Sequence, residues 1–173
     1  MQHQRVVGIQ LRGGVTIDYA EDNPTTYLTG SEWCSGTGAI PNTGDNRWRD
    51  DCKTLYDPCP KGYQVPKGDN EGVWSTALAD TTISVATRWD SVNHGRYWIL
   101  ADGETTAWYP AVGSRSNDRG TLRSVGSNGD YWSASVCWDS YSYAYNLYVY
   151  NSSVMPANYG VPCNSYPVRC IKE

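Results

Sequence analysis

The stretch Gly129-Asp130-Tyr131-Trp132-Ser133-Ala134-Ser135-Val136 decides how this chain folds. Tryptophan, alanine and valine at positions 132, 134 and 136 alternate along it with tyrosine and two serines. A period of two is typical of a half-buried β-strand, because successive side chains of a strand point to opposite faces. The stretch therefore predicts a framework strand whose core face carries Trp132.

Two further strands are predicted after this one. In Asn146-Leu147-Tyr148-Val149-Tyr150, the aliphatic residues Leu147 and Val149 share one face and the tyrosines share the other. The chain closes with Pro167-Val168-Arg169-Cys170-Ile171, a third apolar run. We expect Leu147, Val149 and Val168 to join Trp132 in the core.

Residues 138–145 and 157–166 lie between these strands and show no apolar period. They are rich in Tyr, Ser and Asn, a mixture that binding surfaces favour because Tyr is rigid and amphipathic while Ser and Asn adapt their hydrogen bonds. Sheet-forming tyrosine without a binding role is the alternative. The predicted ligand-binding residues, expected on one face, are Trp138, Asp139, Tyr141, Tyr143, Tyr145, Tyr148, Tyr150, Ser153, Asn158, Tyr159, Val161, Asn164 and Tyr166.

Length and composition fit one globular domain over residues 1–173. With 8 Trp, 14 Tyr and no Phe, the core should be built largely on aromatic rings. The net charge is −4 and the basic residues are scattered, which argues against a nucleic-acid partner because phosphate binding needs a basic face. No apolar run is long enough to cross a bilayer, and no signal-peptide core follows residues 1–5, so we expect a soluble chain without membrane insertion.

The first part of the chain carries weaker signals. Val6–Ile17 predicts an early strand or hairpin, and Glu21–Asn46 is turn-rich and predicts a loop, so residues 1–55 form an N-terminal strand and loop region. Residues 56–66 contain Pro58, Pro60 and Pro66, which fix the backbone in an extended course; we call this segment the strap.

The middle of the chain predicts a helix and a hairpin. Glu71–Ala79 has helical spacing of apolar residues, with Asp69 or Asn70 available as N-cap. Arg96–Leu100 and Thr105–Tyr109 flank the dipeptide Asp102-Gly103. That dipeptide favours a hairpin with a type I′ turn, which needs positive φ at both central residues.

Four segments in order resemble a known family. They are Asp57-Pro58-Cys59-Pro60-Lys61-Gly62-Tyr63-Gln64-Val65-Pro66, Tyr109-Pro110-Ala111-Val112-Gly113, Val125-Gly126-Ser127-Asn128-Gly129-Asp130-Tyr131-Trp132-Ser133 and Val168-Arg169-Cys170. As an ordered set they resemble the Fibrobacter succinogenes major paralogous domain, found in surface proteins of gut bacteria and related to the C-type lectin fold. The resemblance covers about residues 55–172. It implies an α+β domain, mostly antiparallel β with one or two helices and long loops.

The C-terminal part also resembles the variable proteins of diversity-generating retroelements, whose C-type lectin domains present a surface randomised at adenines. All residues of Ala157–Pro167 can arise from diversified AAC codons. This resemblance implies that residues 129–170 form a variable ligand-binding region, with a protein or glycan ligand on a cell surface. It further implies an extracellular, cell-surface or phage-tail location.

The cysteines and the absence of motifs complete the expectations. Six cysteines allow fifteen pairings, which the sequence does not choose among. The related fold implies that Cys59 bonds Cys170, with Cys34 and Cys52 as the second bridge. Because calcium-binding sugar motifs and clustered metal ligands are missing, we expect no metal and no cofactor.

Two other functions remain as alternatives. One is a structural or adhesin-associated surface domain without a diversified site. The other is an enzyme like the formylglycine-generating relatives, with Cys137 and Cys163 as a reactive pair. No cation or His adjoins either thiol in sequence to activate it, so we expect a binding protein and no catalytic residue.

Overall fold

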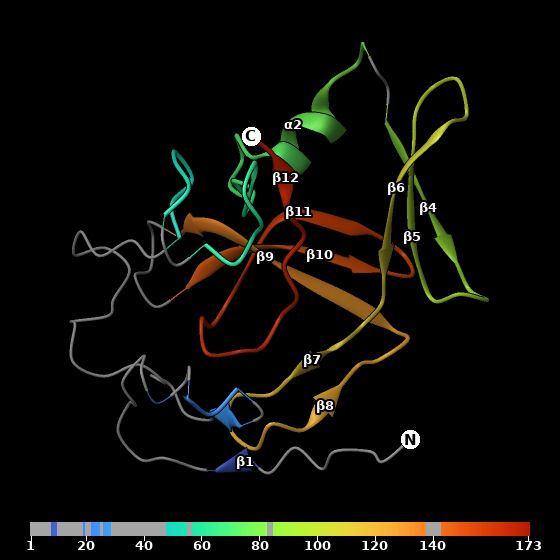
Figure 1. The fold of residues 1–173 in the computed structure, drawn as a ribbon. Helices are drawn as coiled ribbons and strands as arrows, with labels where there is room; N and C mark the ends of the chain where they lie inside the picture. The colour runs from blue at the N-terminus through green and yellow to red at the C-terminus, as the bar shows by residue number, and fades with distance from the viewer. Residues whose placement is uncertain are drawn as a thin grey trace.

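The computed structural model describes residues 8–9, 19, 22–24, 26–28, 48–54, 57–82, 85–137 and 143–173. Most of its regular structure is antiparallel β-sheet (Figure 1). One three-stranded sheet has the order β11-β10-β9 and consists of Asn128–Val136 (β9), Ala144–Tyr150 (β10) and Val154–Gly160 (β11). The other has the order β4-β5-β6 and consists of Ala86–Asp90 (β4), Gly95–Ile99 (β5) and Thr105–Pro110 (β6).

Short elements complete the fold. The helix α2 spans Val73–Ala79. Three strand pairs surround the sheets: Tyr63–Gln64 (β3) with Ile171–Lys172 (β12), Ser114–Arg115 (β7) with Leu122–Arg123 (β8), and the parallel pair Gly8–Ile9 (β1) with Tyr27–Leu28 (β2). The expected α+β class, mostly antiparallel β with a short helix, is confirmed. Among the described residues no helix has the length and apolarity to span a membrane.

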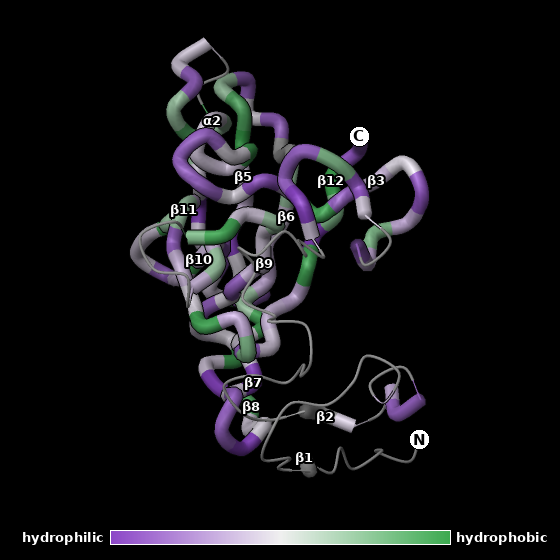
Figure 2. The backbone as a smooth tube through the Cα atoms, turned by 90° about the vertical axis from the view of Figure 1, so that its left-hand side faces the viewer, coloured by the Kyte–Doolittle hydropathy of each residue, from purple (hydrophilic) through white to green (hydrophobic). Residues whose placement is uncertain are grey.

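The main core lies where β9 and β10 pass beside β5 and β6 (Figure 2). It contains four aromatic and two aliphatic residues: Trp74, Trp98, Tyr109, Tyr131, Leu147 and Val149. The Tyr109 ring contacts Trp98 and Tyr131 with centroids 5.6 and 5.2 Å apart, and its hydroxyl accepts a hydrogen bond from Trp74 Nε1 at 2.9 Å. Aromatic packing of this kind stabilises a core beyond the area that it buries, and the predicted aromatic core is confirmed.

At Gly129, the first residue of the stretch 129–136, strand β9 comes very close to the end of β6. A Cβ atom on Gly129 would lie 2.6 Å from the carbonyl oxygen of Pro110, a distance that side chains do not tolerate. In the β-ladder Gly129 pairs with Val149, which is fully buried. The absence of a side chain at Gly129 therefore allows β9 to pack directly against the end of β6.

The edge of β9 that faces away from β10 is covered by two other parts of the chain. Ala134 donates its N–H to the Pro66 carbonyl at 2.9 Å, and Trp132 donates its N–H to the Pro167 carbonyl at 3.0 Å. The strap and the C-terminal segment are joined beside this edge by the Cys59–Cys170 disulfide, which was predicted. Beneath it, Cys59, Val65 and Ala134 form a second small core, against which the half-buried Val168 packs.

Arg96 ties the two large sheets together. This buried β5 residue donates hydrogen bonds to the carbonyl oxygens of Tyr150, at 2.7 and 3.2 Å, and Asn151, at 3.0 Å. A further bond reaches Thr87 Oγ1 on β4 at 2.9 Å. Burial lowers the pKa of Arg96, because none of its hydrogen-bond acceptors carries a charge. The hydrogen bonds of Arg96 hold the turn between β10 and β11 in place.

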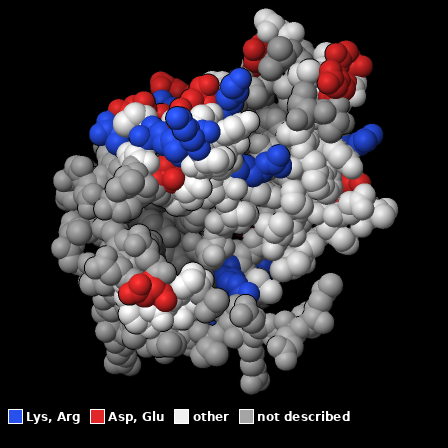
Figure 3. Space-filling model, viewed as in Figure 1, with Lys and Arg blue, Asp and Glu red and all other residues white. Residues whose placement is uncertain are grey.

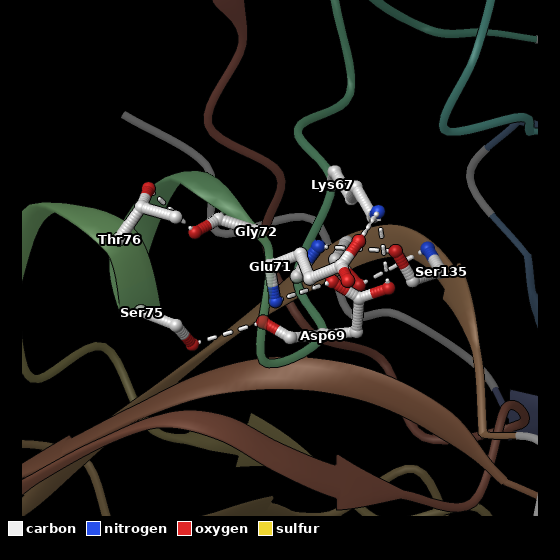
Figure 4. Close-up of polar contacts among 9 residues, drawn as sticks. Lys67, Asp69, Glu71, Gly72, Ser75, Thr76 and Ser135 are labelled. Atoms are coloured by element: carbon white, nitrogen blue, oxygen red, sulfur yellow. Dashed lines mark hydrogen bonds and ion pairs between the residues drawn. The ribbon is translucent and has the colours of Figure 1, made fainter. Parts of the chain in front are cut away.

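The helix lies where it was expected, but it begins and is capped differently. Val73, Ala77 and Leu78 pack with the buried Trp74 against the core, as predicted. Gly72 is the N-cap and provides no side-chain hydrogen bond, so neither Asp69 nor Asn70 caps the helix. Asp69 instead accepts the N–H of Glu71 at 2.9 Å in a turn before the helix, which Figure 4 shows beside Ser135 of β9.

The hairpin is confirmed, but its turn differs from the type I′ turn expected. The β5 and β6 strands pair antiparallel across residues 100–104. Gly103 has a φ of 89°, Asp102 does not have positive φ, and Gly103 N–H bonds the Leu100 carbonyl at 2.9 Å. The Leu100 N–H then bonds the Glu104 carbonyl, which gives the three-residue loop with one left-handed glycine.

Three strand predictions need correction. Strand β9 is buried on both faces rather than half-buried, because the aromatic core covers one face and Tyr166 of the C-terminal segment covers Trp132 on the other. Strand β11 occupies Val154–Gly160, where no strand was predicted because residues 157–166 show no apolar period; Pro156 is tolerated because β11 is an edge strand with a bulge. The last predicted strand, 167–171, shrinks to β12 and an isolated bridge from Val168 to Trp132.

Two of the N-terminal expectations fall on described residues. Gly8–Ile9 is a strand, as one of the two alternatives for Val6–Ile17 predicted, and it pairs parallel with Tyr27–Leu28; the rest of Val6–Ile17 lies outside the described residues. Cys52 is an exposed free thiol, so the Cys34–Cys52 bridge is wrong at its Cys52 end, and Cys34 lies outside the described residues.

Removing the disulfide should destabilise the protein strongly. The bridge joins residues separated by 111 positions, and closing a loop of that length is worth about 4–5 kcal/mol in the chain-entropy model. We expect the C59A/C170A variant to lose stability on this scale in urea unfolding followed by tryptophan fluorescence. C52A, which removes an exposed free thiol, is the matched control and should unfold like the wild type. Coincident curves for the double variant and the wild type would contradict the expectation.

Candidate functional site

The ladder of β9, β10 and β11 gives this sheet two chemically different faces. Leu147 pairs with Tyr131, and both lie on the core face. Asn146 pairs with Trp132 on one side and Asn158 on the other, and Tyr148 pairs with Asp130 and Met155, so these side chains lie on the opposite face. We call this opposite side the outer face.

The outer face carries part of the predicted ligand-binding set. The rings of Tyr148 and Tyr150 are half-buried and contact each other with centroids 5.0 Å apart. Asn158 is half-buried beside them on β11. The alternation that was predicted for Asn146–Tyr150 is thus confirmed, since Leu147 and Val149 are fully buried.

The segment after β11 folds back over the outer face (Figure 1). The Tyr166 ring stacks on Trp132 with centroids 4.3 Å apart, and Asn164 donates its amide to the Tyr166 hydroxyl at 3.0 Å. A Cβ atom on Gly160 would lie 3.0 Å from Cε2 and the hydroxyl of Tyr166, so a larger residue there would require the Tyr166 side chain to shift by a few tenths of an ångström. Trp132 is 6% exposed, as predicted for a core residue, but it is buried under Tyr166 rather than in the main core.

The other predicted tyrosines point to the opposite side of the sheet. Tyr145 and Tyr159 pair with each other and alternate with Asn146 and Asn158. Tyr159 is 56% exposed and its ring contacts Tyr143 at 5.4 Å. The expectation that all the tyrosines share one face is therefore wrong, because the period of a strand divides neighbouring residues between two faces.

The remaining predicted positions are distributed around these two groups. Ser153 and Val161 are half-buried, one before β11 and one directly after it. Trp138, Asp139 and Tyr141 lie outside the described residues.

A buried polar chain crosses the outer face and was not predicted as part of the site. Asn146, which is fully buried, donates its amide to Asp130 Oδ1 at 2.9 Å. Its own Oδ1 accepts the amide of Asn158 at 3.3 Å. One signal was present in the sequence: Asp130 and Asn146 are polar residues inside two framework strands, where an unpartnered polar group would be costly.

Burial controls the ionisation of this cluster. It raises the pKa of Asp130 to about 6, against the effect of the Asn146 hydrogen bond. Burial, and then the nearby Asp130 carboxylate, raises the pKa of Tyr166 to about 12, and the same causes raise that of Tyr148. The phenols are therefore neutral hydrogen-bonding groups at physiological pH, whereas Asp130 titrates close to it.

The two cysteines near the site have the environment of structural thiols. Cys137 and Cys163 are both buried and free. Asn117 donates its amide to Cys163 Sγ at 3.3 Å, and burial raises the pKa of this thiol. A nucleophilic cysteine needs a lowered pKa, so the environment of Cys163 gives no support to a reactive pair.

Charged groups gather away from this sheet. Figure 3 shows Lys, Arg, Asp and Glu side chains intermingled over the strap and the start of α2, where Lys53 pairs with Asp57 and Lys67 with Asp69 and Glu71. Asp57 also accepts hydrogen bonds from the N–H groups of Cys59 and Val65. Burial raises the pKa of Asp57, but these bonds and Lys53 outweigh burial and lower the pKa overall.

In the described part of the chain no group of three or more His, Cys, Asp or Glu is placed to hold a metal ion.

No protein-family model matches this chain, and neither a curated protein nor a solved structure does.

Substitutions on β10 and β11 should change the free energy of unfolding according to how deeply the side chain is buried. Leu147 is fully buried in the core, and L147A should cost roughly 2–5 kcal/mol because it leaves a cavity. Tyr159 is 56% exposed, and Y159S should change the free energy of unfolding by about 0.5 kcal/mol or less. Urea unfolding of the two variants measures the difference. An equal cost for both would show that the exposed tyrosine is part of the core.

The Asp130 carboxyl should make stability depend on pH. Its folded pKa, about 6, exceeds the unfolded value, so the stability it contributes is complete below about pH 4 and is lost as the pH rises through 6. We expect D130N to exceed the wild type by up to roughly 2 kcal/mol at pH 7.5 and by almost nothing at pH 4. Urea unfolding across this range tests it, with E104Q, an exposed acid in the β5–β6 loop, as control. A constant difference between D130N and wild type would contradict the assignment.

Proposed function

We propose that this chain is a ligand-binding module of C-type lectin type, in which a buried framework presents a diversified surface from β10, β11 and the segment after them. The observation that carries the proposal is the contrast within β10. Leu147 and Val149 are fully buried, while Tyr148 and Tyr150 between and beyond them remain partly exposed. Residues on the surface can change without loss of the core.

The composition of this surface supports recognition by aromatic anchors. Residues 140–168 contain no Asp, Glu, Lys or Arg, although charged residues make up 18% of the chain. Tyrosine and asparagine supply contact area and hydrogen bonds instead, as they do in antibody-like binding sites. A few such aromatic anchors dominate the affinity of an interface.

The same features fit the variable protein of a diversity-generating retroelement. A decisive genetic test is a near-identical copy of the codons for residues 138–167 beside a reverse-transcriptase gene, differing mainly at adenines. The proposed ligand is a protein or glycan on a cell surface, and the proposed location is extracellular, on a cell surface or on a phage tail. A structural disulfide is in keeping with an oxidising compartment.

Binding should depend on the tyrosines and not on salt. The chain, labelled and screened on glycan and cell-surface-protein arrays, should give hits that Y148S/Y150S or Y143S/Y159S reduces at least tenfold. Y63S, which removes a tyrosine 44% exposed on β3, is the control and should bind like the wild type. Because the surface lacks charge, raising NaCl from 50 to 500 mM should change the affinity less than about threefold.

The two double variants identify the side of the sheet that binds, since Tyr148 and Tyr150 lie on the outer face and Tyr159 on the other. Circular dichroism establishes that each variant is folded. Hits that survive both double variants, or that vanish at high salt, would refute the proposal.

A further inference from the structure

The Asp130–Asn146–Asn158 chain connects a buried acid to the surface. Each member lies on a different strand, β9, β10 and β11, and all three side chains are on the outer face. The acid is 7% exposed and Asn146 is fully buried, whereas Asn158 is half-buried. Asn158 uses its amide nitrogen for the bond to Asn146, and among the described residues no hydrogen bond to its Oδ1 is found, so this oxygen can accept one from a ligand.

We propose that Asp130 determines, through Asn146, whether Asn158 offers a hydrogen-bond acceptor or a donor to a ligand on the outer face. The proposal makes Asp130 and Asn146 specificity-determining residues that no ligand touches. Its meaning for recognition rests on the proposed function, but the hydrogen-bond chain itself exists without a ligand.

The direction of the chain follows from what each group can donate. An ionised carboxylate only accepts, so Asn146 must turn its amide nitrogen toward Asp130. The Asn146 oxygen then faces β11, so Asn158 must donate its amide nitrogen to this oxygen. The two hydrogen bonds, of 2.9 and 3.3 Å, have these directions. The oxygen of Asn158 is thereby the atom presented outward.

Protonation permits the reverse arrangement. When Asp130 takes one proton from solvent, its O–H can donate to the Asn146 oxygen, and the Asn146 nitrogen then donates to the oxygen of Asn158. The nitrogen of Asn158 becomes the outward group. Both amides turn over and the long bond from the Asn146 amide to the Leu147 carbonyl, 3.5 Å, is given up. No covalent bond changes, and the proton remains on Asp130.

The phenols and the thiol around Asp130 stay protonated between pH 4.5 and 7.5. Tyr148 of β10 and Tyr166 of the C-terminal segment lie on the same face as Asp130, Tyr131 adjoins it in β9 on the core face, and burial raises the pKa of all three phenols. The thiol of Cys163, which neighbours Tyr166, also has a raised pKa. The Arg169 guanidinium lies over the Tyr109 ring, 4.6 Å from its centroid. Between pH 4.5 and 7.5 the change of charge in this group therefore belongs to Asp130.

The test follows the side-chain amides of the ligand-free full chain by ¹H–¹⁵N NMR from pH 4.5 to 7.5. We expect the Asn146 and Asn158 amide signals to shift together with one midpoint near pH 6. Asn164, whose amide donates to Tyr166 outside the chain of three, is the internal control and should shift little. In D130N, which keeps the shape of the acid, the two signals should not titrate.

A second variant separates the relay from a direct effect of the acid. N146L should leave the Asp130 carboxyl titrating, seen by ¹³C NMR, while the Asn158 amide no longer responds. An Asn158 signal that is constant in the wild type while Asp130 titrates would overturn the proposal. So would an Asn158 signal that still titrates in D130N. Because no ligand is present, failure here leaves the array result untouched, and failure on the arrays leaves the relay untouched.

Discussion

The hydrogen bonding of β9 along both of its edges is the constraint on which the rest of the structure depends. One edge pairs with β10, and the other receives carbonyl oxygens from Pro66 and Pro167. Proline has no N–H but keeps its carbonyl, so it can accept from a strand edge without extending the sheet further. The disulfide from Cys59 to Cys170 joins the two covering segments, which are remote in sequence. A strand that would otherwise be an exposed edge becomes the centre of the molecule.

This arrangement separates the residues that stabilise the fold from those proposed to bind. The aromatic core lies on one side of β9 and β10, and the polar chain of Asp130, Asn146 and Asn158 lies on the other. The outer face is not simply solvent-exposed, because the segment ending at Tyr166 shields its centre. Buried polar groups there are satisfied by one another, which is the condition for placing them beneath a surface at tolerable cost.

Local sequence patterns predicted the parts of the fold that local physics determines. The alternation of Leu147 and Val149 with tyrosines, the apolar spacing of the helix and the hairpin glycine each depend on near neighbours, and their elements are where the patterns placed them. Strand β11 could not be predicted, because Pro156 argues against a strand unless the segment lies at an edge, and edge position is a property of the whole sheet. The Asp130 cluster was hidden for the same reason, since the register of three strands brings its members together.

Arg96 holds the β10–β11 turn through hydrogen bonds to backbone atoms, which affects how residues in the turn can vary. The guanidinium holds the carbonyl oxygens of Tyr150 and Asn151, which every amino acid possesses, and contacts neither side chain by hydrogen bond. Substitutions at these two positions therefore leave the acceptors of Arg96 in place. Because Arg96 binds backbone atoms, its contribution to the shape of the turn does not depend on the side chains at these two positions, so a fixed geometry is compatible with varied side chains at this end of the sheet.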